Sequence, residues 1–96
     1  MTDKLVNAHR FLIRSRYRHI IEGKGFHDEQ FLLNFCDEAQ NINNPDKLSR
    51  WVGFLQGVLI ERGVLDVKFE RELTREIYKP IYEELGYDTT TVEVKK

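Results

Sequence analysis

The chain has 96 residues, of which 41% are hydrophobic and 32% are charged, a composition typical of one globular domain and not of a disordered chain. A net charge of −1 argues against bulk electrostatic attraction to nucleic acid or membrane surfaces, and no apolar run reaches the roughly 20 residues of a membrane span. The single cysteine, Cys36, cannot form an internal disulfide, and the first ten residues carry charges where a signal peptide needs apolar side chains. We therefore expect a single helical domain over 1–96, located in the cytoplasm.

The first two predicted helices cover 4–22 and 28–40. Thr2 is the expected N-cap of the first, and the glycines at 23 and 25 end it. Asp28 is the expected N-cap of the second helix. The apolar face of the first helix follows from residues at steps of three and four: Leu5, His9, Leu12, Ile13, Tyr17, Ile20 and Ile21.

The third predicted helix covers about 45–62, with Asn44 as N-cap and a proline at the first helical position. Its apolar surface is too wide for a single stripe, so we expect it to be the central helix. Asp66 caps the fourth helix, in which Pro80 predicts a kink or a break. Short loops between four helices predict an all-α, compact four-helix domain of two helical hairpins, followed by an extended or loose tail at 87–96.

Two glycines interrupt the apolar pattern of the third helix. Gly53 and Gly57 lie one turn apart beside Trp51, and each costs about 0.8–1 kcal/mol relative to alanine in a helix interior. Three interpretations remain open: close packing on another helix of the same molecule, the crossing point of a homodimer, or a ligand lying against the bare backbone.

The segments RWVGFLQGVL at 50–59 and ERELTRE at 70–76 resemble a pattern found in small uncharacterised proteins of bacteriophages and prophages. In that pattern the first helix precedes an Arg-x-x-Thr-Arg segment, which is matched here by Arg71, Thr74 and Arg75. The family's proline after the second arginine is replaced by Glu76, so we expect the last helix to continue. The resemblance implies a phage or mobile-element origin and carries no catalytic role.

Polar residues of the last two helices form one candidate site. If these helices make an antiparallel hairpin, guanidinium and amide groups would converge in an arrangement suited to phosphate or carboxylate. The alternative is that the arginines pair with acids across the hairpin, namely Glu61, Glu70, Glu72 or Asp66. The residues of this candidate site are Arg50, Gln56, Arg71, Thr74 and Arg75.

A basic row on the first helix forms the second candidate site. Arg10, Arg14 and Arg18 recur every four residues and repel one another, so an acidic partner is expected. Residues 1–27 carry a charge of +4 and residues 28–96 a charge of −5. The partner is therefore the acidic half of the same molecule or of a second copy, an acidic protein surface, or, less favoured, nucleic acid.

Catalysis is not expected. His9, His19 and His27 lack metal-ligand spacing, Cys36 lies on an apolar stripe, and no glycine-rich phosphate loop is present, so we predict neither metal nor cofactor. The favoured interpretation is a non-enzymatic, phage-type accessory protein that binds a host or phage protein and self-associates as a homodimer. The alternatives are a binder of a small anionic, nucleotide-like ligand and a nucleic-acid binder that uses the basic helix at 4–22.

Overall fold

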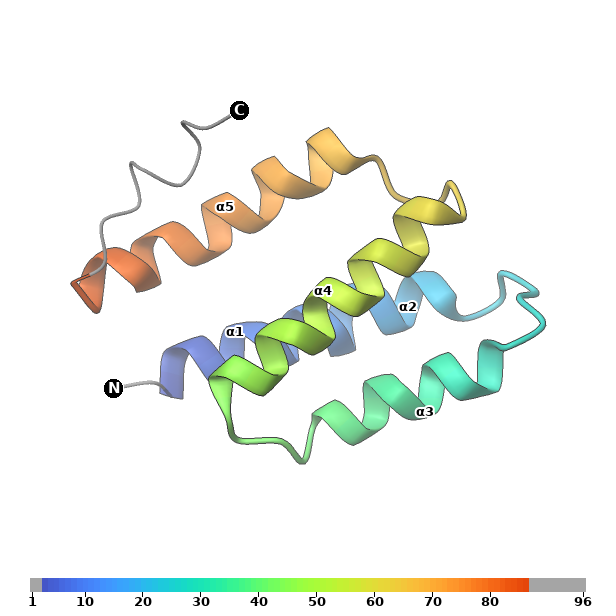
Figure 1. The fold of residues 1–96 in the computed structure, drawn as a ribbon, viewed down its shortest axis with the longest axis horizontal. Coiled ribbons are helices and arrows are strands. Elements are labelled where there is room, and N and C mark those ends of the chain that lie inside the picture. Colours follow the sequence, from blue (N-terminus) through green and yellow to red (C-terminus); the bar gives the residue numbers. More distant parts are fainter. Residues whose placement is uncertain (1–2, 87–96) are drawn as a thin grey trace.

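The computed structural model describes residues 3–86, and within this part of the chain all regular structure is helical (Figure 1). The predicted cap at Thr2 and the predicted tail at 87–96 lie outside the described residues. The helical segments are α1 (Asp3–Phe11), η1 (Leu12–Tyr17), α2 (Arg18–Ile21), α3 (Glu29–Ala39), α4 (Pro45–Glu61) and α5 (Val67–Glu84). Because α1, η1 and α2 follow one another without a break, they form one long helix. The predicted all-α four-helix domain is confirmed, and no helix in the described region is long and apolar enough to cross a membrane.

The first helix contains a π-helical stretch that the sequence pattern did not reveal. In η1 the backbone hydrogen bonds span five residues instead of four, as where the Arg18 N–H donates to the carbonyl of Ile13. A wider turn holds more residues, so neighbouring side chains are separated by a smaller angle than in an α-helix. Adjacent side chains such as those of Arg16 and Tyr17 therefore lie closer in direction here than they would in an α-helix.

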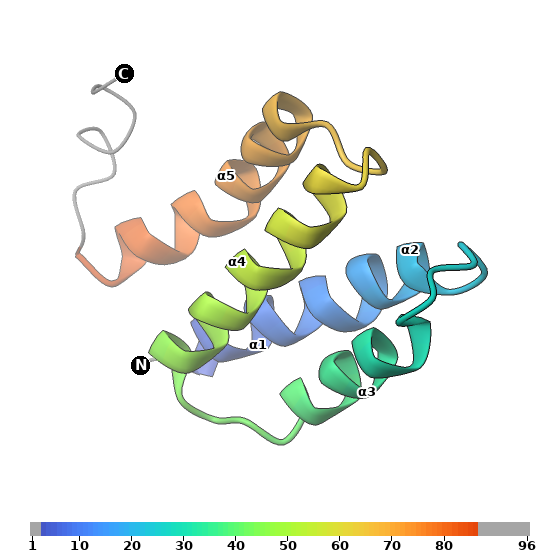
Figure 2. The same ribbon diagram turned by 45° about the vertical axis from the view of Figure 1, so that its right-hand side comes forward.

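The helices form two hairpins that pack across one another (Figures 1 and 2). The first helix and α3 make one hairpin, and α4 and α5 make a second, open one whose helices diverge from their loop and pack mainly on the first helix. The sequence predicts the 45–62 helix at the centre; in the structure the first helix is the element against which α3, α4 and α5 all pack. The buried core lies between these elements and includes Leu12, Ile13, Tyr17, Ile21, Leu32, Cys36, Leu48, Leu55 and Leu59.

Local signals place most helix ends correctly. Asn44 Oδ1 accepts from Lys47 N at 3.0 Å, and Asp66 Oδ2 accepts from Phe69 N at 2.8 Å, so both predicted N-caps are confirmed. Gly63, with φ +78°, follows α4 in the left-handed conformation that glycine adopts at low cost.

The capping role predicted for Asp28 is wrong. Asp28 precedes α3, but its side chain makes no cap hydrogen bond. Its two carboxylate oxygens instead accept from Nη1 and Nη2 of Arg62 at 2.7 and 2.9 Å. This bidentate pair connects the start of α3 to the end of α4, and the hydrogen bonds from Arg62 lower the pKa of Asp28 to about 2.

Pro80 does not break the last helix, because α5 continues to Glu84. Proline removes one backbone donor and crowds the carbonyl of Glu76. Both residues lie on the exposed side of α5, where water can satisfy that carbonyl. The continuation expected from Glu76 standing in place of the family's proline is confirmed.

Candidate functional site

The basic row of the first helix is largely engaged within the molecule. Arg10 donates from Nε and Nη2 to the carbonyl oxygen of Ile42 at 3.1 and 2.8 Å, and Nη2 also donates to Asn43. Arg14 is exposed, with a long contact of 3.4 Å from Nη1 to Gln40 Oε1. Arg10 therefore holds the loop between α3 and α4, whereas Arg14 makes only a long contact at the end of α3.

Arg18 finds its acidic partner in the same chain. Its Nε donates to Asp37 Oδ1 at 2.7 Å, and Nη1 pairs with Glu22 one turn later. The hydrogen bond from Arg18 lowers the pKa of Asp37. For Arg18 the predicted pairing with the acidic part of the same molecule is confirmed.

The polar set predicted on the second hairpin does not converge. Arg50 and Gln56 are six residues apart on one α-helix, which directs them about 120° apart around its axis. Arg50 is exposed, whereas Gln56 is half-buried against the first helix. On α5, Arg71 and Arg75 are exposed, and Thr74 Oγ1 donates to the carbonyl of Glu70, within its own helix, at 2.9 Å.

A buried polar network takes the place of the predicted anion site. Glu70 is only 1% exposed and accepts from Arg16, whose Nε lies 3.1 Å from both carboxylate oxygens and whose Nη2 lies 2.6 Å from Oε1. Tyr17 donates its hydroxyl proton to Glu70 Oε2 at 2.6 Å, and Gln56 Nε2 donates to the Tyr17 oxygen at 2.9 Å. Burial and the hydrogen bond to Glu70 raise the pKa of Tyr17.

This network joins η1, α4 and α5, and two adjacent residues of the π-helical stretch, Arg16 and Tyr17, both reach the Glu70 carboxylate. A buried charge is tolerated when it is paired and fully hydrogen-bonded, as Glu70 is. The predicted pairing of Glu70 with arginines of the second hairpin is wrong, because its partner is Arg16 of the first helix. Its place in line with the apolar face of α5, three residues before Leu73 and seven before Ile77, was the available signal.

The glycine pair does not bring helices of this molecule together. Gly53 and Gly57 are exposed, and no atom outside their local helix lies within 4 Å of the position that a Cβ would take at either residue. Close intramolecular packing at these glycines, the first of the three interpretations, is therefore wrong. The structure leaves a bare strip of backbone on the solvent side of α4.

Beside that strip lies a cluster of four aromatic side chains from α3 and α4, which we call the aromatic patch: Phe31, Phe35, Trp51 and Phe54. Phe35 stacks on Trp51 with ring centroids 4.0 Å apart, and it lies 4.8 Å from the ring of Phe54 and 6.2 Å from that of Phe31. Phe31 is 58% exposed and Phe54 43%. Trp51, predicted at a close helix contact, packs on α3 through this stack.

Metal and nucleophile chemistry find no support in the described residues, where no group of three or more His, Cys, Asp or Glu could hold a metal ion. Cys36 is buried, and burial raises the pKa of its thiol to about 11, which disfavours the reactive thiolate. His9 is also buried and contacts Tyr78 on α5, with 2.7 Å between Nδ1 and the hydroxyl oxygen.

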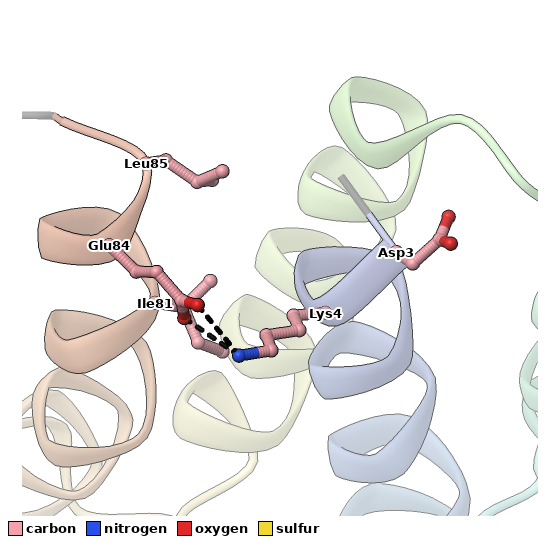
Figure 3. Close-up of a pocket in the computed structure, with 5 residues that line it drawn as sticks. All are labelled: Asp3, Lys4, Ile81, Glu84 and Leu85. Carbon is pink, nitrogen blue, oxygen red and sulfur yellow. Dashed lines mark hydrogen bonds and ion pairs between the residues drawn. The ribbon is translucent and has the colours of Figure 1, made fainter. Parts of the chain in front are cut away.

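A pocket of about 260 Å³ lies between the start of α1 and the end of α5 (Figure 3). Ile81 and Leu85 supply its apolar lining, and Lys4 Nζ donates to both carboxylate oxygens of Glu84 at 2.8 Å. The side chain of Asp3 is directed away from this ion pair. Because Lys4 and Glu84 are both more than half exposed, they offer a ligand little desolvated charge.

Comparisons of the chain with protein-family models, with curated proteins and with solved structures found no match. The resemblance to phage proteins therefore stays a prediction.

Proposed function

We propose that this protein is a non-enzymatic binding module that docks on a protein partner through the aromatic patch of α3 and α4. The observation that carries the proposal is the exposure of Phe31 and Phe54 at 58% and 43%, in ring contact with the half-buried Phe35. Contiguous apolar surface on a soluble domain marks a site of interaction, and aromatic side chains contribute strongly to the binding energy of protein interfaces.

The two alternative functions receive less support from the geometry. Nucleic-acid binding through the first helix would need free guanidinium groups, but those of Arg10 and Arg18 are held by Ile42 and Asp37. A nucleotide-like ligand would need the arginines of the second hairpin to converge with Gln56, which is instead bonded to Tyr17. A phage-type accessory role is what the resemblance implies, and it agrees with a protein that acts by binding.

The proposal is tested by placing a photo-cross-linking phenylalanine analogue at position 31 and irradiating cells that produce the protein. Phe69 on α5 is the matched control, because it is the same residue type with the same exposed fraction of 58%, outside the patch. We expect a discrete protein adduct from position 31 that excess unmodified protein competes away. Equal adduct yields from positions 31 and 69, or no protein adduct from position 31, would overturn the proposal.

A further inference from the structure

Four residues form a straight line along the solvent face of α4. Arg50, Phe54, Gly57 and Glu61 follow one another at steps of four, three and four, so they lie above one another on one side of the helix. All four are exposed. This line, which we call the α4 stripe, runs along the edge of the aromatic patch, since Phe54 belongs to both.

The ends of the α4 stripe carry opposite charges that are unpaired within the described residues. Arg50 and Glu61 take part in none of the ion pairs found in that part of the chain. They are separated by eleven residues, or about 16 Å along the helix. Between them, a large exposed side chain at Phe54 is followed by a bare backbone surface at Gly57, where no atom outside the local helix lies within 4 Å of the Cβ position.

This order of residues is self-complementary under a two-fold axis. If a second α4 lies antiparallel on the first, with the axis between positions 54 and 57, then Arg50 faces the second copy's Glu61 and Glu61 faces its Arg50. In the same register Phe54 faces the second copy's Gly57. In a two-fold interface each residue meets its counterpart twice, so one register satisfies both charges and places both rings on bare backbone.

We propose that a second copy of this chain docks antiparallel on the α4 stripe, with two Arg50–Glu61 ion pairs at the ends and Phe54 seated on Gly57 in the middle. The inference rests on the proposed function and names its partner. Charge complementarity is the reason for choosing a second copy as the partner. An antiparallel copy of α4 places a negative charge opposite Arg50, a positive charge opposite Glu61 and a glycine opposite Phe54, all in one register. The arrangement also covers Phe54, one of the two exposed rings of the aromatic patch.

The decisive test uses charge reversal in the purified protein, with dimer dissociation constants measured by sedimentation equilibrium. Arg50→Glu brings two carboxylates together at each end of the interface, and Glu61→Arg brings two guanidinium groups together in the same way. Each variant alone is expected to dimerise at least about tenfold more weakly than the native protein. An equimolar mixture of the two variants is expected to form a heterodimer that binds at least about tenfold more tightly than either variant binds itself. At one end of the heterodimer the native Arg50 faces the native Glu61. At the other end the two introduced charges, which are also opposite, face each other.

The control is Arg71→Glu, which changes the charge by the same amount on the exposed surface of α5. It is expected to leave dimerisation unchanged. A second variant, Gly57→Leu, fills the proposed socket; because no atom outside the local helix lies within 4 Å of its Cβ position, we expect it to fold and to lose the dimer. Circular dichroism of each variant checks the fold.

A native protein that stays monomeric at hundreds of micromolar would overturn the inference, as would a dimer that neither the charge reversals nor Gly57→Leu weakens. Failure of the mixture to restore dimerisation would also overturn it. None of these results tests the proposed function, which depends on the cross-linking experiment at position 31. If that position cross-links to a different protein while the native chain stays monomeric, the proposed binding function is supported and self-association is contradicted.

Discussion

At the residue scale, the most consequential feature is the set of polar side chains that the fold takes out of water. Glu70 and His9 are 1% and 2% exposed. Glu70 accepts hydrogen bonds from the donors that surround it, as a buried carboxylate must. His9 contacts Tyr78 through Nδ1, while its Nε2 has no hydrogen-bond partner among the described residues, so protonation would place an uncompensated charge in the core.

His9 therefore predicts a loss of stability in weak acid. Burial lowers its pKa from 6.5 to about 4. Between these values the unfolded chain binds a proton that the folded chain does not, so the free energy of unfolding falls as the pH decreases through this window. The loss from His9 alone should reach about 2 kcal/mol at pH 5, measured by urea unfolding at pH 7 and pH 5.

The comparison variant is His9→Gln, which keeps a polar group near Tyr78 and removes the titration. It should lose less stability than the native protein between pH 7 and pH 5. His19→Gln changes an exposed histidine, 83% of whose side chain is accessible, and should behave like the native protein. Identical pH dependence in all three proteins would contradict the buried, neutral state of His9.

At the element scale, α4 has two contrasting sides, one buried and one exposed to solvent. Its buried side holds Leu48, Val52, Leu55 and Leu59, one residue per turn of a regular apolar stripe. Its opposite side holds both glycines. Because those glycines face solvent, they lower the helix propensity of α4 without improving the packing of the isolated domain.

Replacing Gly53 by alanine should therefore stabilise the isolated domain. The added methyl meets no atom outside the local helix, and removing a helix-interior glycine should raise the free energy of unfolding by about 0.5–1 kcal/mol. Urea unfolding at low protein concentration measures the change. Gly63→Ala is the opposite control: at φ +78° the new Cβ is strained, and stability should fall. Destabilisation by Gly53→Ala would show that the added methyl meets a neighbour and that this face of α4 is not open.

At the scale of the whole molecule, the four helices are not equally well held. α3 and α4 each bury several apolar side chains completely, whereas Glu70 is the only fully buried residue of α5. The apolar face of α5 is half-buried at Leu73, Ile77 and Ile81. Helices with few buried contacts open at a lower free energy than the rest of a domain.

Native-state hydrogen exchange should therefore show that α5 opens more readily than α4. The opening free energy measured at amides within 73–81 should be lower than that measured at amides within 52–59. Glu70→Ala should lower the opening free energy of α5 further, because Arg16 would be left without its carboxylate and Tyr17 without its acceptor. Lys68→Ala, on the exposed side of the same helix, serves as the control. Equal opening free energies for both helices would mean that α5 is part of one cooperative unit.

The helix spans, the capping by Asn44 and Asp66 and the stop at Gly63 could all be predicted from the residues alone, because each depends on groups within one or two turns. The pattern also indicated where unusual residues stand, such as the glycines of α4. Which way those residues face could not be predicted before the helices were packed. The glycines face solvent, Asp28 pairs with Arg62, and Glu70 is enclosed by Arg16 and Tyr17 of the π-helical stretch. Both polar pairings depend on groups that lie tens of residues away in the sequence. Local periodicity fixes a helix and its apolar face; the partner of each polar side chain is set by how those faces cross.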